Sequence, residues 1–159
     1  MEYPQRKRVR LPDYDYSKNG YYYVTVCTYN RNKLFGKLQN GKICLSEYGK
    51  IADFVWNDLI NHNPIVLHEY VIMPDHIHGI IQINNNSKLI EISEIIRQFK
   101  TFSSLRINKH LKRNGSQPFP TGKLWQKSFY DHIIRDENDY IVKSQYIINN
   151  PIDERELYK

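Results

Sequence analysis

The chain has 159 residues, of which 40% are hydrophobic, so it can build one ordinary globular core and has little room for a second. No apolar run approaches the roughly 20 residues that span a bilayer, and no apolar segment follows the basic N-terminus as in a signal peptide. Lys and Arg number 23 against 17 Asp and Glu, a net charge of +6, which favours a polyanionic partner without requiring one. We therefore expect a single cytoplasmic domain over residues 1–159.

Residues 1–20 are polar and basic. This arm could lie along the phosphates of a nucleic acid, or it could be a solvated terminus. Its basic residues are Arg6, Lys7, Arg8 and Arg10.

The two cysteines, Cys27 and Cys44, are too few for a disulfide framework and do not have the spacing of a zinc site. Both lie in apolar runs that are typical of strands. We expect them to be buried free thiols in a reducing compartment.

Apolar periodicity predicts strands and helices along the rest of the chain. Pro and Gly mark the turns between them, and no internal repeat is visible. In chain order we expect strands at 21–29 and near 42–45, a helix at 47–61, strands at 66–73 and 76–83, a helix at 88–110, a loop at 113–123, extended segments at 124–126 and 129–134, and a helix from 136 to about 149. This order indicates an α+β fold, an antiparallel sheet with helices packed on it as in a ferredoxin-like sandwich.

The most distinctive local pattern is Pro74-Asp75-His76-Ile77-His78. Alternate residues of a strand share a face, so His76 and His78 point the same way. Two imidazoles in this arrangement can bind one metal ion. A histidine pair on a strand can equally be a surface feature without function.

A second pattern lies on the last predicted helix. Tyr146 and Asn150 are four residues apart, so they project from one helical face beside the apolar stripe. This face can present a phenol and an amide to a site on the sheet. Tyr146 could also simply pack at the edge of the core.

Three blocks in this order and spacing resemble the single-tyrosine HUH transposases, and among them the REP-associated tyrosine transposase branch. The first block is His76-Ile77-His78 after Pro-Asp. The other two are Leu124-Trp125-Gln126 with the following run 129–136, and Gln145-Tyr146-Ile147-Ile148-Asn149-Asn150-Pro151. The resemblance covers nearly the whole chain.

The resemblance implies a role for several residues. His76 and His78 would bind a divalent metal ion, Mg²⁺ or Mn²⁺, and Asn150 would be a third ligand at a position where the wider family often has Gln. Tyr146 would be the nucleophile, while Asp75 and His132 would lie near the site. On sequence alone Tyr130 is a rival nucleophile, although it does not match the family's catalytic position.

The activity implied is cleavage and rejoining of single-stranded DNA, and nothing in the sequence indicates lost catalysis, since both histidines and the tyrosine are present. A tyrosine would attack a phosphodiester, remain attached as a 5′-phosphotyrosine, and release a 3′-hydroxyl, so no nucleotide cofactor is needed. The substrate would be single-stranded or hairpin-forming REP-like DNA, and the protein would act as a monomer or homodimer. The alternative is a transposase-derived protein that binds single-stranded DNA without cutting it. Beyond the N-terminal arm, candidate phosphate contacts are Arg97, Lys100 and Lys123.

Overall fold

The computed structural model describes residues 20–84 and 90–157. Four antiparallel strands form its main sheet in the spatial order β4-β5-β1-β6. These strands are β1 (Gly20–Cys27), β4 (Ile65–Met73), β5 (His76–Ile83) and β6 (Tyr130–Ile134). The central pair β1 and β5 is therefore hydrogen-bonded on both edges.

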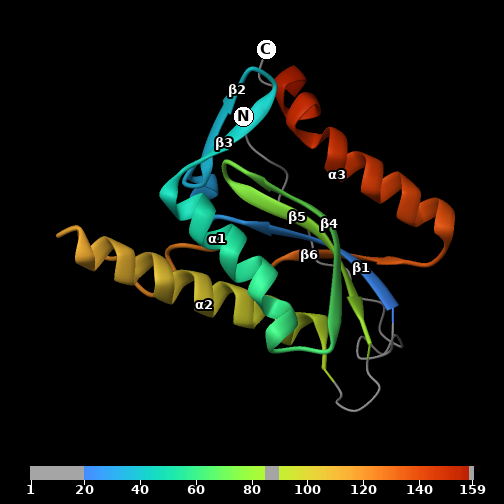
Figure 1. Ribbon diagram of the computed structural model, residues 1–159, viewed down its shortest axis with the longest axis horizontal. Coiled ribbons are helices and arrows are strands. Elements are labelled where there is room, and N and C mark those ends of the chain that lie inside the picture. Colours follow the sequence, from blue (N-terminus) through green and yellow to red (C-terminus); the bar gives the residue numbers. More distant parts are fainter. Residues whose placement is uncertain (1–19, 85–89, 158–159) are drawn as a thin grey trace.

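Helices cover both faces of the sheet (Figure 1). α1 (Glu47–Asp58) and α2 (Ile92–Arg113) lie on one face, and α3 (Glu137–Leu157) lies on the other. Strands and helices alternate as β1-α1-β4-β5-α2-β6, which is the ferredoxin-like arrangement, so the predicted α+β fold is confirmed. No helix in the described part of the chain is long and apolar enough to cross a membrane.

Strand alternation divides the side chains between two clusters. Tyr22, Val24 and Val26 of β1 point into the larger cluster, which α1 and α2 cover. Tyr23, on the opposite face, belongs to a smaller cluster with Ile147 of α3. The sheet is thus buried on both sides, and the face under α3 is the one that carries His76 and His78.

The β5 strand and α1 approach closely at Gly79. A Cβ atom at this position would lie 2.3 Å from Cζ2 of Trp56, whose ring is fully buried. The absence of a side chain at Gly79 lets the indole lie flat against the backbone of the strand that carries the two histidines. The packing of α1 therefore depends on this glycine.

The predicted strand near 42–45 exists, but it belongs to a separate hairpin. β2 (Gly36–Gln39) pairs only with β3 (Lys42–Leu45), and Asn40 and Gly41 form the turn with φ values of 52° and 76°. The prediction of two buried thiols is wrong for Cys44, which is exposed because alternation along β3 places it on the outer face, opposite Ile43 and Leu45. Cys27 is half-buried at the end of β1.

The last helix is longer than its sequence predicts. Pro151 was expected to end it, yet α3 continues to Leu157. A proline removes one backbone hydrogen bond from a helix but leaves the turns on either side able to form. The helix expected at 88–110 corresponds to α2, which begins and ends three or four residues later.

The segment between α2 and β6 is held to the sheet from both sides. Its backbone joins the end of β1 through the hydrogen bond from Gln126 N to Cys27 O (2.9 Å). From α2, the Lys100 ammonium donates to the carbonyls of Gln126 (2.7 Å) and Ser128 (3.1 Å). Burial lowers the pKa of Lys100 to about 8, opposed only in part by the charge of Cys27.

We expect Gly79→Ala to destabilise the protein by about 1–3 kcal/mol, because the new methyl group overpacks the contact with Trp56. Urea unfolding followed by circular dichroism measures the loss. The double variant Gly79→Ala/Trp56→Phe is the control, since a smaller ring makes room for the methyl group. Its loss should be smaller than the sum of the two single losses, and simple additivity would contradict the explanation.

We expect Lys100 to titrate with a midpoint near pH 8 in the folded protein and near its ordinary value of 10.5 in urea. Carbon-13 NMR of the labelled lysine Cε reports both midpoints. Because the folded state loses this proton first, Lys100 should favour folding more at about pH 9 than at about pH 7, relative to Lys100→Met. A folded-state midpoint equal to that in urea would overturn the assignment.

Candidate active site

His76 and His78 lie together on the face of β5 that α3 covers. Their ring centroids are 4.6 Å apart, with the rings at 74° to each other, and both side chains are buried. In the described part of the chain, no three His, Cys, Asp or Glu residues are grouped so as to hold a metal ion. A metal at the pair would therefore need a ligand of another type.

The Nδ1 atom of His78 is held by β1. Tyr23 Oη lies 2.9 Å and Thr25 Oγ1 2.8 Å from it, from neighbouring positions of one strand face. The Tyr23 ring also stacks on the imidazole at 5.6 Å. With Nδ1 held in this way, Nε2 is the nitrogen through which His78 would bind a metal.

His76 has a different partner, the carboxylate of the residue before it. Asp75 Oδ1 lies 2.6 Å from His76 Nδ1, and Arg31 Nε donates to Asp75 Oδ2 at 3.1 Å. Burial raises the pKa of Asp75, but the hydrogen bond to His76 and the charge and hydrogen bond of Arg31 outweigh burial and lower it. The Asp75 carboxylate is therefore ionised at neutral pH.

Tyr146 lies across the site from the histidines. Its ring centroid is 5.5 Å from that of His78 and 6.4 Å from that of Tyr23. The side chain is nevertheless 45% exposed, whereas Ile147 beside it is buried against the sheet. Tyr146 thus combines a ring contact with His78 and access from solvent, as an attacking group requires.

Asn150 lies one turn beyond Tyr146 on α3. Its side chain is only 3% exposed, and its amide nitrogen has no hydrogen-bond partner among the described residues. The unpaired nitrogen is a hydrogen-bond donor and would meet an acceptor such as a phosphate oxygen, whereas a metal ion would bind the amide oxygen. Two imidazoles and one amide oxygen form a mixed donor set that suits Mn²⁺ and tolerates Mg²⁺, so the chemistry of these residues fits the predicted ion.

Two further residues from the sequence analysis lie on the same face of β6. Tyr130 meets Tyr23 edge to face with centroids 6.4 Å apart. His132, which is paired with Tyr23 across the strands, donates from Nε2 to the Asp139 carboxylate of α3 at 2.8 Å. His132 therefore joins α3 to the sheet beside the candidate site.

The predicted phosphate contacts have different surroundings. Arg97 is exposed on α2 and paired with Glu94 (2.6 Å), and the Lys100 ammonium donates to the two carbonyls described above. Lys123 donates to Tyr29 Oη at 3.1 Å, in the turn that also carries Arg31. The arginines and lysine of the N-terminal arm, Arg6, Lys7, Arg8 and Arg10, lie outside the described residues.

Sequence reasoning missed four residues at the site. Three of them, Tyr23, Thr25 and Arg31, touch the histidines or Asp75 from β1 and the turn after it. The fourth is Lys143, whose ammonium lies 5.4 Å above the Tyr23 ring, one turn before Tyr146. Alternation along β1 places Tyr23 and Thr25 on one face, but only the strand register shows that this face adjoins His78.

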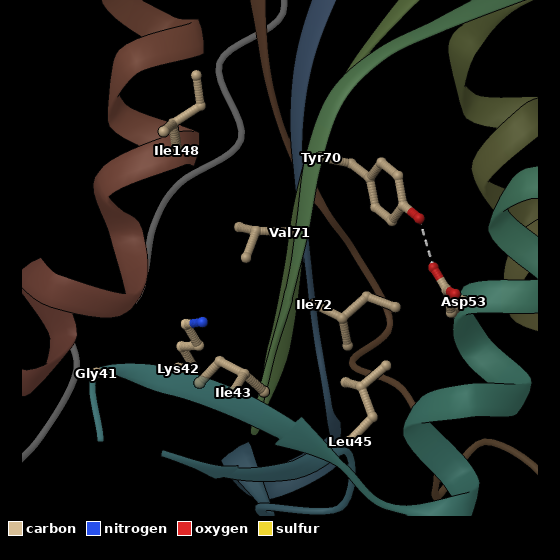
Figure 2. Close-up of a pocket in the computed structure, with 9 residues that line it drawn as sticks. All are labelled: Gly41, Lys42, Ile43, Leu45, Asp53, Tyr70, Val71, Ile72 and Ile148. Atoms are coloured by element: carbon tan, nitrogen blue, oxygen red, sulfur yellow. Dashed lines mark hydrogen bonds between the residues drawn. The ribbon is translucent and has the colours of Figure 1, made fainter. Parts of the chain in front are cut away.

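A groove of about 440 Å³ adjoins the site on the side of β4 (Figure 2). Val71 in its wall is paired with His78 in the neighbouring strand, and Ile148 of α3 faces it. Most of the wall is aliphatic, but the Tyr70 hydroxyl donates to Asp53 at one end. The groove therefore lies against β4, the strand next to the one that carries the histidines.

Sequence comparison identifies relatives of the whole chain. The profile of the family described as "Transposase IS200 like" matches residues 16–150. An uncharacterised Haemophilus influenzae protein is 33% identical over 92% of this chain and 88% of its own length. A second protein of that organism, named as a provisional REP-associated tyrosine transposase, is 26% identical over 87% of this chain and 73% of its own.

Two solved structures share the fold. A REP-associated tyrosine transposase bound to a REP hairpin superimposes with a TM-score of 0.64 at 21% identity, covering 97% of this chain and 74% of the other. A provisional transposase from Deinococcus radiodurans gives 0.54 at 20% identity, covering 91% and 97%. With a family profile that spans most of the sequence and a fold shared with these enzymes, the chain belongs to the IS200-like transposase family.

Proposed function

We propose that the protein is a metal-dependent DNA strand transferase that cleaves and rejoins single-stranded DNA through Tyr146. Membership of a transposase family supports the class of reaction. The observation that carries the assignment of residues is the position of Tyr146, half-exposed and with its ring 5.5 Å from that of His78. Tyr146 is preferred over Tyr130 because its ring contacts His78 and because it lies at the position of the family's catalytic tyrosine.

In the proposed step the Tyr146 oxygen forms a bond to phosphorus while the bond from phosphorus to the 3′ oxygen breaks. The phenol proton passes to water, and the leaving 3′ oxygen takes up a proton. The product is a 5′-phosphotyrosine that keeps the energy of the phosphodiester. Attack by another 3′-hydroxyl reverses the step on a new strand and frees Tyr146.

The metal site would comprise His76, His78 and Asn150. A bound Mg²⁺ or Mn²⁺ would supply Lewis-acid stabilisation of the charge that develops on the phosphate. The protein's own contribution is to hold the two imidazoles in fixed orientations through Tyr23, Thr25 and Asp75. Lys143 adds a positive charge one turn before Tyr146, where a phosphate would approach.

Hairpin-forming single-stranded DNA is the proposed substrate. A family relative with the same fold has been solved bound to a REP hairpin. The net charge of +6 attracts phosphate. Lys123 is hydrogen-bonded to Tyr29, in the same turn as Arg31. Arg97 and the N-terminal arm remain candidates for contacts along the strand, whereas Lys100 is engaged with the carbonyls of residues 126 and 128.

We expect the protein to form a covalent adduct with labelled hairpin oligonucleotides when Mn²⁺ or Mg²⁺ is present. The adduct, measured on a denaturing gel, should disappear in Tyr146→Phe and on addition of a chelator. The amount of adduct should also fall by at least about 100-fold in His76→Ala, because this variant lacks one ligand of the metal ion that would stabilise charge on the phosphate.

Tyr130→Phe is the matched control, since it removes a tyrosine hydroxyl from the same face of the sheet and keeps Tyr146 and both histidines. An adduct lost only in Tyr130→Phe would keep the chemistry and overturn the choice of nucleophile. Tight binding of hairpins with no adduct would instead favour the non-cutting DNA-binding protein.

We further propose that each chain carries a complete site, because Tyr146 reaches His78 of its own chain. A mixture of His76→Ala and Tyr146→Phe proteins should then form no adduct. Each variant is mixed with wild-type protein as the control for inhibition. Recovery of adduct in the mixture of the two variants would mean that partners exchange α3 and that the site is shared.

A further inference from the structure

The turn after β1 has an unusual backbone. Asn30 and Arg31 are consecutive residues with positive φ, 53° and 55°, a conformation that costs free energy for any residue except glycine. The turn is nevertheless held firmly. Thr28 N donates to the Asp75 carbonyl at 2.9 Å, and Arg31 N donates to the Thr28 carbonyl at 3.1 Å. A strained turn fixed to the residue before His76 indicates that the placement of its side chains matters.

This turn places the Arg31 side chain beside Asp75. Its Nε and Nη2 reach the two oxygens of Asp75 at 3.1 and 3.4 Å, and its Nη1 donates to Cys27 Sγ at 3.1 Å. The guanidinium thus holds the carboxylate at two points and is itself held at a third. Asp75 is 1% exposed, so its oxygens depend on protein partners in place of water.

The Asp75 carboxylate in turn determines where the proton of His76 lies. Arg31 donates to both oxygens of Asp75, so the carboxylate is the acceptor in its 2.6 Å contact with His76, and the proton of that contact lies on His76 Nδ1. Arg31 Nη2 lies 3.5 Å from the same nitrogen, at the outer limit of a hydrogen bond, and the shorter contact decides. Nε2 is then left with its lone pair, as a metal ligand requires.

We infer that Arg31 is a positioning residue, which through Asp75 holds His76 in the tautomer and orientation that bind metal through Nε2. This inference rests on the metal-dependent function proposed above and extends it to a residue that never needs to touch metal or DNA. His78 is held by the hydroxyls of Tyr23 and Thr25, which come from β1. The turn thus acts on His76 through Asp75, while β1 supports His78.

The test uses the full-length protein labelled with nitrogen-15 histidine and free of metal. Long-range proton–nitrogen NMR correlations distinguish the two neutral tautomers of His76 without any catalysis. We expect the Nδ1–H tautomer in the wild type and a mixture of tautomers in Asp75→Asn and Arg31→Met. Isothermal titration with Mn²⁺ should show a Kd raised about 10–100-fold in Asp75→Asn and about 10-fold in Arg31→Met, the range found for residues that orient metal-bound histidines.

Two comparisons sharpen the result. Arg113→Met removes an exposed arginine in the last turn of α2 and should leave both readouts unchanged. Arg31→Lys keeps the charge but cannot hold both carboxylate oxygens, so it should recover less than half of the lost affinity. If Asp75→Asn fails to fold, Arg31→Met still carries the test, because the Arg31 side chain is 24% exposed and lies at the surface of the turn.

The inference is overturned if folded Arg31→Met keeps the wild-type tautomer and binds Mn²⁺ within about twofold of the wild type. It is also overturned if Arg31→Met weakens only DNA binding, which would make Arg31 a phosphate contact. If the variants shift the tautomer of His76 but the wild-type protein binds no Mn²⁺, the metal-dependent function is refuted and the positioning role is retained.

Discussion

The candidate site depends on the packing of α3 against the sheet through a small apolar contact. Ile147 is buried against Tyr23, Ile80 and Ile134, which come from three different strands. Because Ile147 and Tyr146 are neighbours in a helix, burying the first fixes where the second can point. The hydrogen bond between His132 and Asp139 and that between Tyr140 Oη and His68 (3.1 Å) secure the first turns of the same helix. Without this contact the helix would carry a tyrosine with no histidines opposite it.

The two faces of the sheet therefore have different tasks. Most of the apolar surface lies on the side of α1 and α2, where Trp56 and Phe99 fill the space over the central strands. The face under α3 has a small apolar cluster, and this leaves room for polar groups along β1 and β5. Stability supplied by the first face allows the second to hold two imidazoles, two hydroxyls and an ionised carboxylate close together. Such polar groups are costly to bury unless each has a partner, and the site provides those partners.

Sequence patterns predicted the positions of strands and helices better than they predicted which strands pair. Alternation and helical spacing are local properties, so strands 66–73 and 76–83 and the helix beginning near 47 were recognised to within a few residues. Strand β2 (Gly36–Gln39), the partner of β3, was missed because it is too short and too polar to stand out. The extent of α3 beyond Pro151 was also missed, since a proline lowers helical propensity without deciding the outcome. The family was recognised from three motifs, and the family profile confirms it.

The site shows the same division between local and long-range information. His76, His78 and Tyr146 stand out because their motifs are short and contiguous. Tyr23, Thr25 and Arg31 do not, since their meaning arises from register: β1 pairs Thr25 with His78 and Cys27 with His76. One residue of slippage would turn Tyr23 and Thr25 toward the large core and leave His78 without its hydroxyl partners. The residues that support a reactive group are therefore harder to read from a sequence than the group itself, because their role exists only once the strands have paired.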